Sequence, residues 1–418
     1  MAVPRRLRWL PRGNVRTISA TNFLAGLYQS ALNVVLQPFV LGFGGGLTAV
    51  GLLQALSARV GGLVSALVQP VGGYLADARG RRPVAILGSA LTIASMALLI
   101  AGAALQREPW ALPALVLPGF LCMAASMVSS PAIQSAIAES TEPRRRVSAY
   151  ATATFFWVLP GALLAIPLGL ASDRLGYGAV FGVALGLESA NLVLFARFLR
   201  ETAPHTDVHP WRERLAATLH PPPEVRGLFL VVAMDAFAWG LAAGIINGIL
   251  KKEFGFSNLE LGTIAAGWAL SFAAFLPPTA ALVHRFGPKR VIRFSEALGV
   301  PIMLGWLFSS RLEHFLLVSV LNGLTAATWV PVVSTYLTNW TTADRRAGAL
   351  GSLAAFRGIL AFPAPFLGGL LYDTLGYPAP LLANLAGALA ITVAISFLLK
   401  DPPAAGVEAG AAPRSAGR

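Results

Sequence analysis

The segment that decides the fold is Gly73-Tyr-Leu-Ala-Asp77-Ala-Arg79-Gly80-Arg81-Arg82, because it separates two long apolar stretches with glycine and charge. The stretches on either side, residues 47–76 and 84–105, each exceed the roughly 20 residues that a helix needs to cross a bilayer core of about 30 Å. Both stretches therefore indicate membrane-spanning helices, with the charged segment as the loop between them.

The composition of the whole chain supports this interpretation. Of the 418 residues 56% are hydrophobic and 12% are charged, and the mean hydropathy is +0.66. A soluble chain carries about a quarter charged residues, so the composition excludes an ordinary soluble protein. The single cysteine, Cys122, excludes an internal disulfide and a cysteine-clustered metal site. We expect no metal and no cofactor.

Twelve apolar runs of spanning length occur along the chain, so the expected fold class is an all-α membrane protein with twelve transmembrane helices in two six-helix, pseudo-symmetric bundles. The runs cover residues 15–41, 47–76, 84–105, 111–138, 147–170, 177–199, 225–250, 259–284, 291–310, 315–338, 347–371 and 377–399.

These spans divide the chain into five parts. Residues 1–14 are a basic cytoplasmic arm, and residues 15–199 and 225–399 are the two six-helix bundles. Residues 200–224 are a cytoplasmic connection with a short amphipathic helix, and residues 400–418 are a disordered cytoplasmic tail.

The net charge of +13 is a topology signal rather than a nucleic-acid site. With an even number of spans both termini share one side, and most of the 32 Lys and Arg residues fall in loops on that side. The positive-inside rule places that side, with both termini, in the cytoplasm. We expect a multi-pass monomer in the cell inner (plasma) membrane.

The two halves of the chain repeat each other. Residues 139–177 align without a gap on residues 339–377 at a constant offset of 200, which places Asp173 on Asp373. Upstream, Gly80 matches Gly287 at an offset of 207. Two six-span units of the same topology imply parallel repeats with a central site between them.

The loop of residues 73–82 resembles the signature loop of the major facilitator superfamily, and the resemblance extends over the whole chain. A degenerate second copy follows at residues 282–290, with His in place of Asp. The signature residues of the two copies are Gly73, Asp77, Gly80, Arg81 and Arg82 in the first, and His284, Arg285 and Gly287 in the second.

The resemblance implies a secondary transporter that works by alternating access. It also implies that the loop contacts the start of helix 11, which would pair Asp77 with the stretch near Arg346, and that it biases the outward-open state. Ala78 departs from the family, where the position is often basic.

Five ionisable residues fall well inside the predicted spans. Placing a charged side chain at the centre of a bilayer costs from about 3 to over 10 kcal/mol of free energy, so such residues usually have a functional or structural role. Arg59 and Arg357 either hold an anionic substrate, interact with a proton-carrying carboxylate, or form structural ion pairs with Asp235 or Glu188. Asp235, near the middle of its span, is the first candidate for proton coupling. Glu188 and Glu296 are further candidates on helices that contribute less to the cavity in the family.

Polar residues inside the spans supply candidates for substrate contact. Asn22, Gln29, Asn33 and Gln37 form one helical stripe, which faces either the cavity or a neighbouring helix. The family resemblance adds that helices 1, 4, 7 and 10 line the central path. On that basis the further candidates are Ser126, Ser130, Gln134, Trp239, Asn322 and Trp329.

The leading functional hypothesis is proton-coupled efflux of an amphipathic small molecule or drug. One alternative is proton-coupled uptake of an organic anion held by Arg59 and Arg357, and another is a non-transporting membrane receptor on the same fold. Residues 364–369, Ala-Pro-Phe-Leu-Gly-Gly, resemble an element of proton-antiporting members and favour export. No Walker loop, dinucleotide fingerprint or zinc-protease motif occurs, so an enzyme is not expected and transport must use a gradient.

Overall fold

The computed structural model describes residues 13–58, 61–142, 146–202, 221, 223–340 and 346–400. Within these ranges the ordered elements are helices. Ten helical segments are long and apolar enough to cross a membrane. The two remaining predicted spans are present as the broken pair α2 (Leu47–Ser57) and α3 (Leu63–Arg79), and as α7 (Arg146–Leu175). The predicted fold class is therefore confirmed.

The other helices of the first half follow the predicted spans within a few residues. They are α1 (Asn14–Leu41), α4 (Arg81–Ala104), the run η2 (Leu112–Val116), α5 (Leu117–Ala125), η3 (Ser126–Val128) and α6 (Ser129–Glu139), and α8 (Tyr177–Phe198).

The second half repeats this order. Its helices are the run α10 (Arg226–Ala242), η5 (Ala243–Ile245) and α11 (Ile246–Phe254), then α12 (Asn258–Phe286), α13 (Pro288–Ala297), α14 (Gly299–Phe308), α15 (Leu312–Asn339), α16 (Arg346–Ala361), α17 (Ala364–Leu375) and α18 (Pro378–Leu398).

The second span differs from its prediction because the helix breaks between Ser57 and Leu63. α2 ends where its cap Ala58 takes a non-helical ψ of 132°, and Gly61, two residues before α3, has a positive φ of 86° that favours glycine. Ser65 Oγ lies 2.8 Å from the carbonyl oxygens of both Ala58 and Gly62, which ties the first turn of α3 to the residue that follows α2. Arg59 lies outside the described residues, as do the predicted amphipathic helix and the C-terminal tail.

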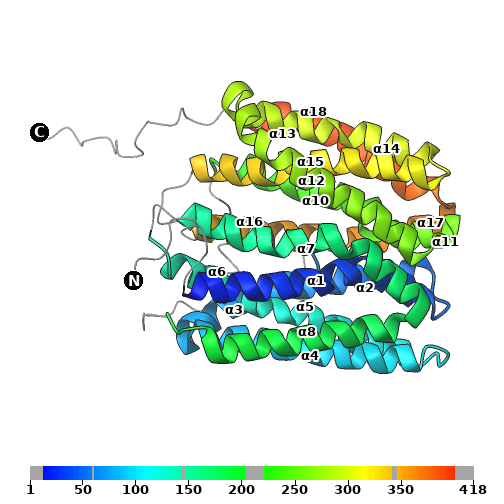
Figure 1. The fold of residues 1–418 in the computed structure, drawn as a ribbon. Coiled ribbons are helices and arrows are strands. Elements are labelled where there is room, and N and C mark those ends of the chain that lie inside the picture. Colours follow the sequence, from blue (N-terminus) through cyan, green and yellow to red (C-terminus); the bar gives the residue numbers. More distant parts are fainter. Residues whose placement is uncertain are drawn as a thin grey trace, which may run out of the picture.

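All helices run along one common direction, and α1 begins at the same end of the molecule at which α18 ends (Figure 1). We call this the terminal end and the opposite one the distal end. The signature loop between α3 and α4 lies at the terminal end, whereas α11 and the end of α17 lie at the distal end.

The hydrophobic cores show where the two halves meet. One core contains Phe39 and Leu47 from the first half together with Ile249 and Phe256 from the second, near the distal end. Toward the terminal end the second half has its own core, which includes Phe229 and Phe356, and the first half has separate smaller ones. The halves therefore share apolar packing at the distal end and are packed separately at the terminal end.

Candidate functional site

A cavity of about 410 Å³ lies between the two halves. The first half contributes α2 and the break that follows it, and the second half contributes α10, α13, α14, α15, α16 and α17. The polar and aromatic side chains on its lining are Gln54, Asp235, Trp239, Ser295, Glu296, Asn322, Thr325, Trp329 and Arg357.

The cavity brings together three of the charged residues that the sequence places inside spans. Asp235 on α10 interacts with the carboxyl group of Glu296 on α13 and with the charge of Arg357 on α16. Within the described residues no direct ion pair joins Arg357 to either carboxylate. The site therefore holds a carboxyl pair with one guanidinium group nearby, on three helices far apart in the sequence.

Glu296 lies differently from its expectation. The family resemblance gave the ninth span, residues 291–310, a minor part in the cavity. Instead Glu296 is only 7% exposed and lines the same cavity as Asp235. Its neighbour Ser295 donates to the carbonyl oxygen of Thr325 at 2.8 Å and accepts from Thr328 Oγ1 at 2.9 Å, which fixes α13 against α15.

Aromatic side chains form the apolar part of the lining. Trp239 lies one helical turn after Asp235, and its ring packs against Trp306 with centroids 5.9 Å apart. Trp329 and Asn322 reach the lining from α15, two turns apart on the same face. The arrangement can hold a flat apolar group beside charged and amide groups.

Gln54 is a lining residue that sequence reasoning missed. It is the polar side chain that the first half contributes to the described lining, and it comes from α2 just before the break. An amide inside an apolar span was the available signal.

The polar stripe of α1 lies off the described cavity lining, and its side chains bond within α1 or to neighbouring helices. Asn22 Nδ2 donates to the carbonyl oxygen of Ala153 on α7 at 2.9 Å, and Gln29 Nε2 donates to Asn33 Oδ1 at 3.1 Å. Gln37 crosses to the second half near the distal end. Its amide donates to the carbonyl oxygen of Gly244 at 3.0 Å and accepts from the N–H of Gly248 at 2.7 Å.

The candidates on the fourth span, residues 111–138, also lie off the described lining. Ser126 Oγ donates to the carbonyl oxygen of Met123 at 2.7 Å within its own helix. Gln134 Nε2 donates to Ser130 Oγ at 3.2 Å, and the carbonyl oxygen of Gln134 accepts from Tyr150 Oη on α7. These contacts connect turns and helices of the first half.

Glu188 is buried inside the first half. Its Oε2 accepts from Tyr28 Oη at 2.7 Å and from Asn191 Nδ2 at 2.9 Å. These two donors compensate for the loss of water around the carboxylate. Glu188 is absent from the cavity lining, so the structure separates it from Asp235 and Glu296.

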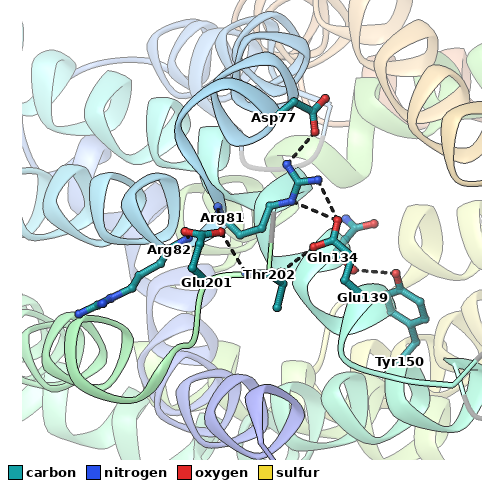
Figure 2. A network of polar contacts seen from close by, with 8 residues as sticks. All are labelled: Asp77, Arg81, Arg82, Gln134, Glu139, Tyr150, Glu201 and Thr202. Atoms are coloured by element: carbon teal, nitrogen blue, oxygen red, sulfur yellow. Dashed lines mark hydrogen bonds and ion pairs between the residues drawn. The ribbon is translucent and has the colours of Figure 1, made fainter. Parts of the chain in front are cut away.

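The signature loop builds a polar network at the terminal end (Figure 2). Arg81 is 6% exposed, and its guanidinium group reaches Asp77 on α3 at 2.7 Å and Glu139 on α6 at 2.8 Å. Glu201 accepts from the N–H groups of Arg81 at 2.7 Å and Arg82 at 3.1 Å, so it caps the start of α4.

The remaining signature residues shape the two loops. Arg82 also donates to the carbonyl oxygen of Ala196 on α8. Gly73 lies within α3, and Gly80 and its counterpart Gly287 both have positive φ at the reversal between two helices. His284 and Arg285 lie in the last turn of α12. The expected contact of Asp77 with the start of the eleventh span, near Arg346, stays a prediction. Residues 341–345 lie outside the described part of the chain.

Comparison with known proteins agrees with this architecture. Residues 18–223 and 228–416 match the model of the Major Facilitator Superfamily. Multidrug resistance protein MdtG of Salmonella choleraesuis is 26% identical over 370 residues, which are 85% of this chain and 88% of that protein. The match covers both halves and the loop between α3 and α4.

Solved structures share the fold. The human organic anion transporter MFSD10 superposes with a TM-score of 0.68 at 20% identity, covering 94% of this chain and 100% of that one. A mutant of the nucleoside transporter NupG superposes with a TM-score of 0.72 at 11% identity, covering 93% and 100%. The family and these relatives are transporters and not enzymes. This chain belongs to the Major Facilitator Superfamily of membrane transporters.

Proposed function

We propose that this transporter exports an amphipathic small molecule in exchange for protons. The observation that carries the proposal is the cavity at the boundary of the two halves, where Asp235, Glu296 and Arg357 lie with Trp239 and Trp329. The relative MdtG is named a multidrug resistance protein, which supports a drug-like small molecule as the substrate.

The carboxyl pair is the proton carrier of the proposal. Two interacting carboxyl groups in a site of low dielectric bind and release protons as one unit. A nearby guanidinium charge favours the ionised pair, so a change in the distance between Arg357 and Asp235 shifts the proton equilibrium. Arg357 on α16 and Asp235 on α10 belong to different helices, and a rearrangement of these helices links proton release to a change of access.

Access changes when the two halves rock against each other about the cavity. The moving bodies are residues 15–199 and 225–399. The shared apolar core and the Gln37 contacts with Gly244 and Gly248 hold the distal end together. We assign the terminal end, with its basic loops, to the cytoplasm of a cell whose inner membrane holds the protein as a monomer.

The test is transport in proteoliposomes with an imposed pH gradient of either sign. We expect a fluorescent amphipathic dye to move only in the presence of the gradient, with protons moving in the opposite direction. Asp235→Asn abolishes the dependence on the gradient. The matched control is Glu188→Gln, which removes a buried carboxylate outside the cavity and keeps an acceptor for Tyr28.

Two outcomes overturn the proposal. Unchanged coupling in Asp235→Asn removes this residue from the mechanism. Ligand binding without movement in the wild-type protein, under either gradient, indicates a receptor instead.

The second candidate function is uptake of an organic anion, which the position of Arg357 on the lining favours. The related fold of MFSD10, an organic anion transporter, is compatible with it. In that case Arg357→Gln abolishes binding of a carboxylate compound and leaves a neutral compound of the same shape unaffected. Equal losses for both compounds count against the anion hypothesis.

A further inference from the structure

The second copy of the signature loop lacks two of the acidic partners that the first copy has. By the internal repeat, Asp77, Arg81 and Glu139 correspond to His284, Pro288 and Asn339. In the first half these three residues form the buried network around Arg81. In the second half neither carboxylate and no equivalent of the bridging arginine is present, so the same network cannot form.

The second loop nevertheless keeps a dense group of cations. Arg285, Lys289, Arg290 and Arg293 occur within nine residues of the chain, and none of them has an ion-pair partner in the part that the structure describes. Lys289 Nζ lies 3.5 Å from the carbonyl oxygen of Ser396 on α18, and Arg285 stacks on the ring of Phe286. Within the described residues, positive charge is therefore concentrated here without a paired carboxylate.

This group borders a hollow at the terminal end of the bundle. Lys289, Arg290, Arg293 and Phe286 line a cavity of about 460 Å³ at the start of α13. The membrane-spanning segment Pro288–Phe308 begins at the same point, which places the cavity at the level of the bilayer surface. Three cationic side chains around one hollow match the charge and the acceptor oxygens of a phosphate group.

Exposed aromatic side chains occur on the cavity lining and next to residues that contact it. Phe286 is 44% exposed, Phe294 is 52% exposed, and Phe397, next to Ser396, is 83% exposed. A soluble phosphate makes no apolar contact with these rings, whereas the acyl chains of a lipid would pack against them.

We propose that Lys289, Arg290 and Arg293 form a binding site for the phosphate headgroup of an anionic phospholipid. The lipid seats its headgroup between α13 and the end of α18 and supplies the negative charge that Asp77 and Glu139 supply in the first half. Binding would tie the second half to the lipid surface, whereas the first half is closed by its own residues.

The experiment measures lipid binding to the detergent-purified, delipidated protein by native mass spectrometry. The protein is titrated with phosphatidylglycerol and with phosphatidylcholine of the same acyl chains. We expect wild-type protein to prefer phosphatidylglycerol. The triple variant Lys289→Gln, Arg290→Gln, Arg293→Gln reduces that preference by about a hundredfold, because three cations that attract the anionic headgroup are lost.

The matched control neutralises three cations at the distal end, Arg174→Gln, Lys251→Gln and Arg311→Gln, and changes the net charge equally. It keeps the preference for phosphatidylglycerol. An equal loss in both triple variants, or no loss in the first, overturns the proposal. Binding of inorganic phosphate as tight as that of phosphatidylglycerol also overturns it, in favour of a soluble ligand. If the first triple variant fails to fold, the single variants Arg290→Gln and Arg293→Gln carry the test, because both side chains are exposed.

Discussion

Asp173 and Asp373 occupy the same position in the two halves, and each accepts hydrogen bonds from the first N–H groups of a helix in the opposite half. Asp173 reaches the N–H groups of Asn258 at 3.1 Å and Leu259 at 2.9 Å, at the start of α12. Asp373 reaches those of Leu47 at 3.2 Å and Thr48 at 2.8 Å, at the start of α2. Each carboxylate thus caps a helix across the boundary and closes the distal end.

The two caps are unequal, which gives a first prediction. Asp373 also accepts from Thr48 Oγ1 at 2.8 Å and pairs with Lys252 at 2.9 Å. Asp373→Asn therefore opens the distal end more than Asp173→Asn does. Loss of one cap of about 1 kcal/mol should raise the ratio of open to closed molecules about fivefold, and the shift in Asp373→Asn should be the larger of the two. Equal shifts in both variants contradict the prediction.

Spin labels can measure this opening. Arg107 and Arg311 are exposed at the distal end of opposite halves and suit labelling after Cys122→Ser removes the single native cysteine. Distances between the labels report how often the distal end is open. The unlabelled variants should unfold at the same temperature as the wild type, which separates a conformational shift from lost stability.

A second prediction concerns the close approach of α2 and α17. A methyl group at Gly369 would collide with the carbonyl oxygen of Leu47, so Gly369→Ala pushes the two helices apart at the distal end. The control Gly351→Ala meets no atom within 4 Å. We expect the label distance to lengthen in Gly369→Ala and to stay unchanged in Gly351→Ala.

A third prediction separates strain from collision in the signature loops. Gly80 has a φ of 102°, and a methyl group there would meet the carboxylate of Glu201. Gly287 has a φ of 78° and no atom within 4 Å. Both alanine variants incur backbone strain of about 1–3 kcal/mol. Only Gly80→Ala also displaces Glu201 from the start of α4, so its unfolding temperature should fall further.

A fourth prediction tests the aromatic lining. Trp329 lines the cavity, whereas Trp268 stacks on Phe272 with centroids 5.4 Å apart and does not line it. Trp329→Leu should weaken binding of an aromatic amphipathic dye about two- to tenfold, as expected for one lost aromatic contact. Trp268→Leu should leave the affinity unchanged. Fluorescence titration of the purified protein measures both, and an equal loss in the two variants would argue against a direct contact.

The membrane-spanning helices could be predicted from the sequence because hydropathy and length are local properties that the bilayer constrains directly. The same holds for the loop around Gly80, whose residue types are required by a tight reversal. Asp235 and Arg357 could be singled out because ionised groups inside apolar spans are expensive. The side of each helix that faces its neighbours was harder to predict.

The α1 stripe illustrates this limit. Asn22 and Gln37 share a face, yet one contacts α7 and the other contacts the second half, because a helix longer than its neighbours' contact surface meets different partners along its length. Gln54 was missed for a related reason. The break after α2 changes which residues face inward, and a strict helical spacing does not include that change.

By itself the sequence determined that this chain crosses a membrane many times and consists of two repeated units with basic loops. Hydropathy and the constant residue offset between the two halves can be read directly from the amino-acid order. Only the tertiary structure decided that Glu296 lies beside Asp235, that Glu188 belongs to a separate buried cluster, and that Gln37 joins the halves. The physical reason is that contacts between helices distant in the sequence depend on how whole helices tilt and pack, and no local pattern encodes that arrangement.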